Sequence, residues 1–384
     1  MSKRIYLSPP HMSGKELEFI NEAFSSNWIA PVGPHIDLFE KEMCDYTGAN
    51  YAVALSSGTA ALHLALLLSG VKKGDEVFCS TFTFAGSAFP ISYLGAQPIF
   101  IDSETESWNM DPKLLKTAIE ERIKKGKKPG AVIVVHLYGQ SASMKEIKSV
   151  CEHYKVSLIE DAAESLGSYY EDNHTATIGD FGLFSFNGNK IITTSGGGML
   201  IGASKEKIEK ARYLSTQARE PKPYYEHWEV GYNYRMSNIC AAIGRGQLSV
   251  IEKRVSRKRE IFKKYKETLA AIKGISFMPD PQWGRSNKWL SCISIDPQLA
   301  RFSCETLRLA LENENIESRP LWKPMHLQPV FKHAGCFISG VSESLFNSGL
   351  CLPSGTAIND EDLTRVIETI KEVSRSHNSS SLHN

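Results

Sequence analysis

The stretch YAVALSSGTAALHLALLLSGVKKGDEVFCS, residues 51–80, places an apolar run, a helical segment and a second apolar run in succession. The same alternation continues to residue 202. Helix candidates lie at 58–69, 85–94, 111–124 and 144–154, and Asp111-Pro112 is a typical start for the third. The apolar runs are AVAL (52–55), EVFCS (76–80), PIFID (98–102), AVIVVHL (131–137), VSLIED (156–161), FGLFSF (181–186) and GMLIG (198–202). Continuously apolar strands alternating with helices indicate an α/β fold, with a large, mainly parallel sheet covered by helices.

The segment after residue 202 has a different pattern. A long charged helical pattern runs from about 237 to 271, and strand and helix signals follow at 290–295 and 304–314. We interpret the helix as a connection into a smaller C-terminal α+β domain. The sequence thus predicts a large domain with an N-terminal arm (1–255), a small domain (256–374) and a disordered tail (375–384).

Composition excludes several function classes for this chain of 384 residues. It has 44 Lys+Arg and 43 Asp+Glu, so no overall field attracts nucleic acid or an anionic membrane. The longest apolar stretch, 60–68, is far shorter than the roughly 20 residues of a membrane span. The N-terminus lacks the apolar region of a secretory signal, which predicts a cytoplasmic protein. The eight cysteines show no zinc-ligand spacing, so we expect no metal.

Open parallel sheets bind ligands beyond the carboxyl ends of their strands, so the loops that follow the strands are the first candidates for a binding site. The first loop, Ser56-Ser57-Gly58-Thr59-Ala60-Ala61, opens a helix whose free N–H groups suit a phosphate. An ordinary helix cap is the alternative. After the second strand, residues 81–84 (TFTF) bring aromatic rings to the same edge, where core packing is the alternative.

Two further loops carry ionisable groups. Residues 159–164 (IEDAAE) end a buried strand in three carboxylates, which need a cationic partner such as a protonated ring nitrogen. A helix-capping Asp is equally compatible with this segment. Residues 185–198 (SFNGNKIITTSGGG) place Lys190 in a polar, uncharged neighbourhood, where an amine can act as a nucleophile. No GxxxxGK[ST] motif occurs, and Gly244-Arg245-Gly246 lacks the third glycine of a dinucleotide site.

Five segments in this order carry a resemblance to a known family. They are SSGTAALHLAL (56–66), STFTFAGSA (80–88), IEDAAESLGS (159–168), FSFNGNKIITTSGGGML (184–200) and GYNYRMSN (231–238). Together they resemble the sugar-nucleotide aminotransferases of the DegT/DnrJ/EryC1/StrS family. The resemblance extends from YLSPPHMSGKE near the start to CLPSGT near the end. It implies a fold-type I transferase that uses pyridoxal 5'-phosphate.

The resemblance also implies residue roles. Lys190 matches the lysine that binds the cofactor covalently, and Asp161 matches the carboxylate that pairs with its ring nitrogen. Phe84 matches the aromatic that stacks on the ring. Asn233 matches an asparagine that reaches the neighbouring subunit's site, which implies a homodimer. The remaining cofactor-binding matches are Gly58, Thr59, Ala60 and Ser185 around the phosphate, and Glu164 beside the ring.

A departure from the family pattern narrows the resemblance. Many members have His-Pro where this chain has Asn187-Gly188-Asn189. This variant, with SNWIAP, TQARE and RPLWKPMH, resembles the subgroup that makes UDP-bacillosamine precursors. It implies transfer of an amino group from L-glutamate to C4 of a UDP-linked 2-acetamido-2,6-dideoxy-4-ketohexose. We expect contacts to this substrate from Asn187, Arg219, Arg235, Trp322, Lys323 and His326, although each is also compatible with an ordinary surface or packing role.

Alternatives remain open at this point. The same chemistry on a dTDP- or GDP-linked ketosugar, at C3 or C4, is one of them. A pyridoxal-phosphate sugar dehydratase is disfavoured, because the family's dehydratases have histidine in place of the lysine. A regulatory domain that binds the cofactor would need a fused DNA-binding segment, and a non-catalytic binding protein would leave Lys190 and Asp161 without a purpose.

Overall fold

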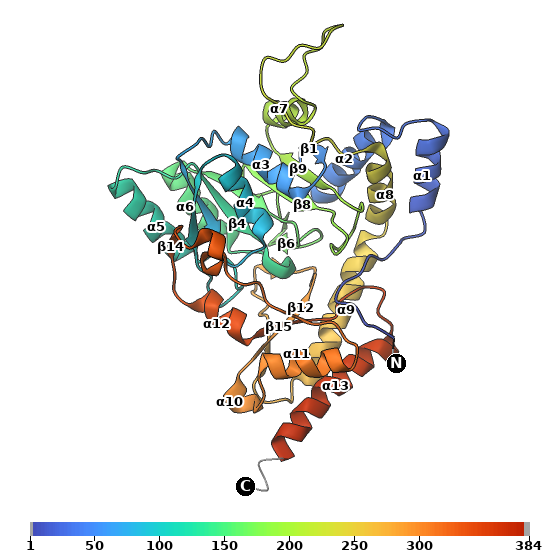
Figure 1. Ribbon diagram of the computed structural model, residues 1–384, viewed down its shortest axis with the longest axis vertical. Helices are drawn as coiled ribbons and strands as arrows, with labels where there is room; N and C mark the ends of the chain where they lie inside the picture. Colours follow the sequence, from blue (N-terminus) through green and yellow to red (C-terminus); the bar gives the residue numbers. More distant parts are fainter. Residues whose placement is uncertain (1–2, 380–384) are drawn as a thin grey trace.

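The computed structural model describes residues 3–379, and an eight-stranded sheet forms its centre (Figure 1). Every strand expected between residues 51 and 202 is present, which confirms the α/β fold. The strand order is β1-β9-β8-β5-β4-β2-β3-β14. The bounds are β1 (Tyr51–Leu55), β2 (Glu76–Ser80), β3 (Gln97–Ile101), β4 (Ala131–Val135), β5 (Ser157–Asp161), β8 (Phe181–Ser185), β9 (Gly198–Gly202) and β14 (Gly335–Phe337).

One strand of the sheet runs against the others. β9 pairs antiparallel with both β1 and β8, whereas the remaining neighbours pair in parallel. The carboxyl ends of β1, β2, β4, β5 and β8 therefore meet at one edge. Because β9 is reversed, the glycine-rich loop that leads into it lies at that same edge.

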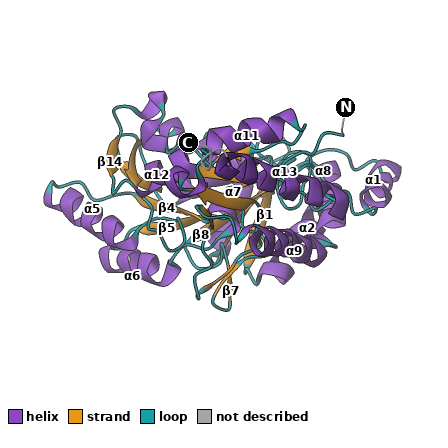
Figure 2. Cartoon of the chain, turned by 90° about the horizontal axis from the view of Figure 1, so that it is seen from below, coloured by secondary structure: helices purple, strands orange, loops and turns teal. Residues whose placement is uncertain are grey.

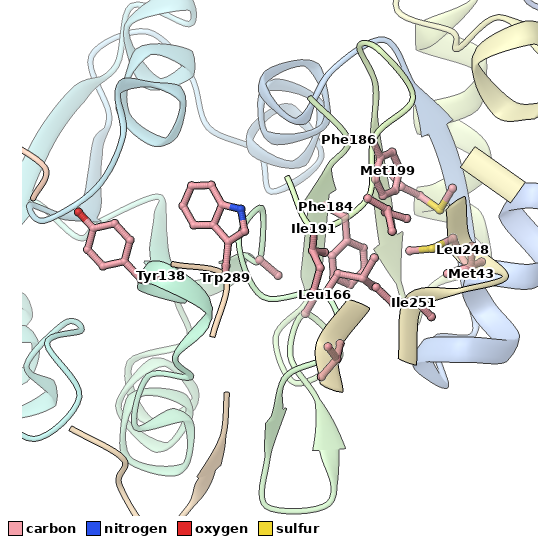
Figure 3. Packing of buried hydrophobic residues seen from close by; sticks show 14 of the residues in the cluster. Met43, Tyr138, Leu166, Phe184, Phe186, Ile191, Met199, Leu248, Ile251 and Trp289 are labelled. Atoms are coloured by element: carbon pink, nitrogen blue, oxygen red, sulfur yellow. The ribbon is translucent and has the colours of Figure 1, made fainter. Parts of the chain in front are cut away.

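Helices cover both faces of the sheet (Figure 2). Side chains of α3 (Gly58–Leu68), α4 (Ala85–Tyr93) and α7 (Lys205–Ser215) pack on one face. The other face is covered by α2 (Pro34–Thr47) and α8 (Asn238–Leu248) near β1, and by α5 (Pro112–Lys124) and α6 (Met144–Tyr154) near β3. In Figure 3, Phe184 and Met199, from neighbouring strands, lie close to Met43 and Leu248 of the covering helices. Each such side chain, fully buried, contributes about 2 kcal/mol.

The C-terminal part forms a second layer system below the sheet in Figure 1. The long helix α9 (Ile251–Leu269) leads into an antiparallel sheet of order β10-β12-β15-β13, packed against α11 (Cys304–Asn313) and α13 (Asp360–Ser379). Its strands are β10 (Ile275–Phe277), β12 (Ser291–Ile295), β15 (Gly349–Leu352) and β13 (Arg319–Pro320). Smaller elements are α1 (Glu16–Ser25), α10 (Pro297–Ala300), α12 (Val341–Ser348), β6 (Tyr169–Tyr170), β7 (Asn173–His174) and β11 (Gly284–Arg285). In the described part of the chain, no helix has the length and apolarity needed to cross a membrane.

The boundaries differ from expectation in three places. The charged pattern at 237–271 is two helices, because Val250 (φ −121°) leaves the helical conformation between α8 and α9. β14, from the expected small domain, pairs in parallel with β3 and extends the large sheet. Residues 375–379 continue α13 instead of forming a disordered tail, since the His377 ring packs 5.9 Å from that of Phe302. The expected tail residues 380–384 lie outside the described residues.

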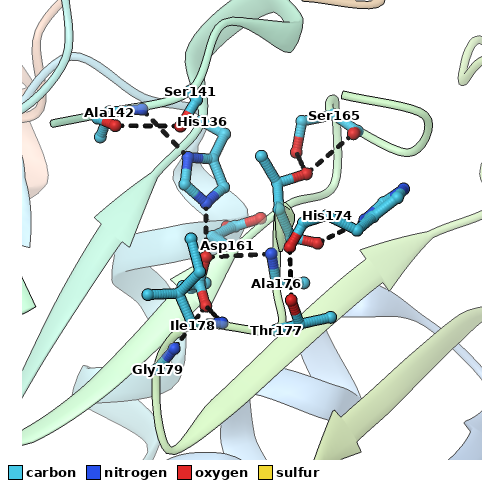
Figure 4. A network of polar contacts seen from close by, with 12 residues as sticks. His136, Ser141, Ala142, Asp161, Ser165, His174, Ala176, Thr177, Ile178 and Gly179 are labelled. Atoms are coloured by element: carbon cyan, nitrogen blue, oxygen red, sulfur yellow. Dashed lines mark hydrogen bonds and ion pairs between the residues drawn. The ribbon is translucent and has the colours of Figure 1, made fainter. Parts of the chain in front are cut away.

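A buried carboxylate network fixes the loop behind β5 (Figure 4). Glu160 has no exposed surface and accepts hydrogen bonds from the backbone N–H groups of Ala176 (2.9 Å), Ile178 (2.6 Å) and Gly179 (2.6 Å). His136 Nε2 lies 2.9 Å from the same carboxylate, while its Nδ1 accepts from the N–H of Ala142. Because Nδ1 is an acceptor, Nε2 carries the proton and donates to Glu160.

We predict that Glu160→Ala lowers the free energy of unfolding by about 3 kcal/mol, because one buried and two half-buried N–H groups and the buried His136 lose their acceptor. Denaturant unfolding of both proteins measures the difference. Glu152→Ala, at an exposed position on α6, is the matched control and should stay within about 0.5 kcal/mol of the unsubstituted protein. Equal stability of the two variants would contradict the assigned structural role of Glu160.

Candidate active site

A cavity of about 300 Å³ lies at the carboxyl edge of the large sheet. Loops after β1, β2, β5 and β8 line it, together with the loop before β9, and Trp289 and Trp322 close it from the C-terminal part. This is where parallel sheets place ligands. The structure brings together these residues named from the sequence: Gly58, Thr59, Phe84, Asp161, Glu164, Ser185, Asn187, Lys190 and Trp322.

The N-terminus of α3 forms one wall. Ser57 is the N-cap, and its hydroxyl accepts from the N–H of Ala60 at 3.0 Å. Ala60, which was expected to contact the phosphate, does not line the cavity, and the cap already occupies its N–H. The first N–H groups of the helix, at Gly58 and Thr59, have no acceptor within the helix and face an anion site favourably. β9 passes so close that a Cβ on Gly198 would lie 2.3 Å from the Ser57 carbonyl carbon.

Asp161 ends β5 and is 7% exposed. Ser87 Oγ donates to its Oδ2 at 2.7 Å, and the N–H of Ala163 donates to Oδ1 at 3.1 Å. Among residues 3–379, no lysine, arginine or histidine forms an ion pair with it. A buried carboxylate with only neutral donors is well suited to bind a cation from a ligand.

Ser87 is a site residue that the sequence analysis missed. It lies on α4, and its hydroxyl is 2.7 Å from that of Thr83 as well as from Asp161. Its position inside the STFTFAGSA segment was the available signal. Nothing in that segment, however, shows that α4 packs beside the end of β5.

Lys190 projects into the cavity with its side chain 12% exposed. Its Nζ lies 3.6 Å from Glu164 Oε1 and 4.4 Å from the centre of the Trp289 ring. The expectation of an uncharged neighbourhood was therefore wrong, because the loop after β5 brings a carboxylate to the amine. Burial raises the pKa of Glu164, although Lys190 and the N–H of Tyr138 favour its charged form.

Aromatic rings form a continuous row from the mouth of the cavity to Lys190. The Phe84 and Trp322 rings are 5.3 Å apart, and Tyr138 stacks between Trp322 (6.1 Å) and Trp289 (6.4 Å). Figure 3 shows Tyr138 beside Trp289, apart from the main apolar cluster. The Trp322 Nε1 is buried and has no hydrogen-bond acceptor in the described structure. Since a buried donor without an acceptor is costly, a ligand atom is a suitable partner for it.

The other residues expected to contact substrate lie outside this cavity. Arg235 is buried in an ion pair with Glu40, so its charge is already neutralised within the protein. His326 bonds to Thr81 Oγ1 through one ring nitrogen and to Glu343 through the other, so both nitrogens are occupied. We therefore withdraw Arg235 and His326 as substrate contacts.

Three further residues named from the sequence do not line the cavity. Lys323 lines an adjoining recess of about 210 Å³ that shares Phe84 and Trp322 with the main cavity. Arg219 stacks over the Tyr225 ring at 4.4 Å, on the segment that projects beyond α7. Asn233 is exposed at the base of the same segment, where it pairs with Thr216.

The raised pKa of Glu164 gives a testable pH dependence. The folded protein binds a proton at Glu164 more tightly than the unfolded chain, so this group stabilises the fold at low pH. That contribution is lost as the pH rises from 4.5, the ordinary value, through the raised value. We predict that Glu164→Gln gains stability relative to the unsubstituted protein over this pH range.

Denaturant unfolding of the cofactor-free protein at several pH values tests this dependence. Glu152→Gln, which changes an exposed carboxylate, is the control and should show no such trend. Parallel stability curves for Glu164→Gln and the unsubstituted protein would contradict the prediction.

Comparison with known proteins agrees with this geometry. The model of the DegT/DnrJ/EryC1/StrS aminotransferase family matches residues 10–371. The EpsN protein of Bacillus subtilis (strain 168), assigned as a pyridoxal phosphate-dependent aminotransferase, is 52% identical over 374 residues, covering 96% of both chains. GDP-perosamine synthase of Escherichia coli O157:H7 is 36% identical over 375 residues, covering 96% of this chain and 98% of the relative.

A solved structure shows the same architecture with the cofactor. Spr1654 of Streptococcus pneumoniae, assigned as a sugar aminotransferase and determined in PMP and PLP forms, superimposes with a TM-score of 0.89 at 26% identity. In the PMP form the match covers 99% of this chain and 100% of that chain. The family match, the relatives and the cavity at the sheet edge agree, so this chain belongs to the DegT/DnrJ/EryC1/StrS family and is a fold-type I, pyridoxal phosphate-dependent sugar aminotransferase.

Proposed function

We propose that this enzyme transfers the amino group of L-glutamate to C4 of a UDP-linked 2-acetamido-2,6-dideoxy-4-ketohexose, giving the 4-amino sugar nucleotide. One observation carries the proposed site: Lys190 and Asp161 line the same cavity, and Asp161 is buried without a cation. These are the two groups that amino transfer needs at opposite ends of the cofactor ring system.

The residues present fit pyridoxal phosphate. The open N–H groups of Gly58 and Thr59, with the Ser185 hydroxyl, would hold the phosphate at the α3 N-terminus. Asp161 would pair with the ring nitrogen, and Phe84 would cover one face of the ring. Gly198 lets β9 pass close to the α3 N-terminus, because any side chain at this position would collide with the backbone of Ser57 and Gly58.

When bound, the cofactor supplies a carbonyl carbon that accepts amines and a ring that withdraws electrons. Lys190 Nζ would take the proton from Cα of the amino donor and pass it to the cofactor's carbonyl carbon in the first half of the reaction, and would carry a proton back from that carbon to C4 of the sugar in the second half. Asp161 keeps a proton on the ring nitrogen, so that negative charge developing at Cα is stabilised. Glu164, 3.6 Å from Lys190 Nζ, holds the amine in place. The lysine at position 190 also argues against the dehydratase alternative, because the family's dehydratases have histidine there.

Neutral and basic groups at the mouth suit a sugar nucleotide. The amides of Asn187 and Asn189 line the cavity and can bind a sugar hydroxyl or acetamido group without burying another charge. Lys323, in the adjoining recess, is available for the diphosphate. The Asn187-Gly188-Asn189 variant and its resemblance to the bacillosamine subgroup support the UDP-linked acetamido sugar.

A GDP-linked ketosugar is the second candidate. It is favoured by relatives named GDP-perosamine synthase, which are 34–36% identical to this chain. Both candidates need the same cofactor and the same roles for Lys190 and Asp161. The two candidate substrates require different protein contacts at the nucleobase and at the C2 position of the sugar.

We predict that glutamate and the UDP-linked ketosugar yield 2-oxoglutarate and the 4-amino sugar nucleotide with a higher kcat/KM than GDP- or dTDP-linked ketosugars. Formation of 2-oxoglutarate, with mass analysis of the sugar product, measures this. Lys190→Ala should abolish turnover, because no other amine lines the cavity among the described residues. A higher kcat/KM for the GDP-linked sugar would replace the UDP assignment, and an active Lys190→Ala variant would remove the assigned role of the lysine.

We also propose a homodimer with shared active sites. Asn233 lies outside its own chain's cavity, at the base of a segment that projects beyond α7 (Figure 1). Tyr225 (78% exposed) and Trp228 (72% exposed) lie on this segment. Clustered exposed aromatic side chains mark an interaction surface, and a second copy would bring Asn233 to its site.

Mixing two inactive variants tests this arrangement. We predict that Lys190→Ala and Asn233→Ala, mixed in equal amounts and allowed to exchange subunits, recover activity in about a quarter of the sites. About half of the dimers are then mixed, and each mixed dimer has one site with both native residues. The separate variants provide the baseline, and mass analysis confirms exchange. No recovery in demonstrably mixed dimers would show that each site is built within one chain.

A further inference from the structure

Lys258, on α9, is a buried charge that the proposed reaction does not use. It is 2% exposed and forms no ion pair with any carboxylate of residues 3–379. Its Nζ donates to the carbonyl oxygens of Trp289 (2.8 Å) and Ser354 (2.9 Å), and to Ser8 Oγ (3.4 Å). Three N–H donors thus meet three oxygens from three distant parts of the chain.

Two of these three partners lead to Lys190. Trp289 Nε1 donates to the carbonyl of Asn189 at 2.9 Å, and Ser8 Oγ donates to the same carbonyl at 3.4 Å. Asn189 directly precedes Lys190, and the Trp289 ring lies 4.4 Å from Lys190 Nζ. Lys258 is therefore two hydrogen bonds away from the backbone that carries the reactive amine.

Stability alone is a poor explanation for a lysine at this position. Burial lowers the pKa of Lys258 to about 7, which shows that the surroundings disfavour its charge. An unbranched apolar side chain would avoid that cost, but it would leave the buried carbonyl oxygens of Trp289 and Ser354 without this donor. The contacts that only an amine can make, to Trp289, Ser354 and Ser8, are thus the reason to retain it.

We propose that Lys258 is a positioning residue, which holds Trp289 and Ser8 so that they fix the carbonyl of Asn189 and hence the place of Lys190. This inference rests on the proposed role of Lys190. Under this proposal, α9 and the N-terminal arm help to position the loop between β8 and β9, which carries Asn189 and Lys190.

Amide hydrogen exchange of the cofactor-free protein tests the proposal directly. In Lys258→Met, whose unbranched apolar side chain is one atom shorter and lacks the amine, exchange across residues 187–191 should rise about tenfold. The same variant, loaded with pyridoxal phosphate, should lower kcat while leaving KM for glutamate nearly unchanged, because the amine is misplaced and the cavity remains.

Tyr265→Phe is the matched control. Tyr265 is also buried on α9, and its hydroxyl donates to the carbonyl of Pro353, next to Ser354, without contacting Trp289 or Ser8. It should lower stability without raising exchange at 187–191. Equal exchange in the two variants would reduce Lys258 to a general structural role and overturn the proposal.

A second variant covers the case in which Lys258→Met does not fold. Trp289→Phe keeps the backbone carbonyl that Lys258 binds and removes the Nε1 donor to Asn189, together with part of the buried indole ring. It should also raise exchange at 187–191, and unchanged exchange would overturn the proposal.

Borohydride trapping of pyridoxal phosphate followed by peptide mapping separates the two hypotheses. Trapping at another lysine in the unsubstituted protein would contradict the proposed site. Trapping at Lys190 with unchanged exchange in the variants would contradict the positioning role alone.

Discussion

The alternation of side chains along β5 is the constraint on which the site depends. Successive residues of a strand face opposite sides of the sheet, so Glu160 and Asp161 cannot serve the same side. Glu160 points toward the loop at 174–179 and fixes it through three N–H groups and His136. Asp161 points toward α4 and the cavity. One carboxylate thus stabilises the scaffold, while its neighbour remains available to a ligand cation.

The cavity is assembled from the loops of the large sheet and from two segments of the C-terminal part. The large sheet supplies the cradle, Asp161 and Lys190, whereas Trp289 and Trp322 come from segments after α9. Tyr138, stacked between these two tryptophans, joins the two parts. Lys258 contacts Ser8 of the N-terminal arm and Trp289, and both of these donate to the carbonyl of Asn189. In our proposal, the position of Lys190 therefore depends on contacts far from the sheet.

Local patterns were sufficient to identify much of this architecture. Each strand of the large sheet between residues 51 and 202 is an apolar run, and the parallel arrangement of all of them but β9 requires that their carboxyl ends meet at one edge. Lys190, Asp161 and the Ser57-Gly58-Thr59 turn could therefore be found from their positions after strands. Ser87 and Trp289 could not, because their roles arise from contacts 74 and 100 positions apart in sequence. Arg235 and His326 were expected to contact substrate, because a sequence does not show that a polar group already has partners within the protein.

The sequence by itself determined the order along the chain of the apolar strands and the helices between them, because that order depends on residue type and periodicity over short distances. The motifs in the loops after these strands indicated the family and the chemistry of those loops. Only the tertiary structure decided which polar groups are free. Asp161 is available and Arg235 is not, since one is packed against neutral donors and the other against Glu40. Likewise, Lys258 reads in the sequence as one more charge on a helix. Its burial among three oxygen acceptors exists only once α9, the residue segments before β12 and after β15, and the arm are packed together.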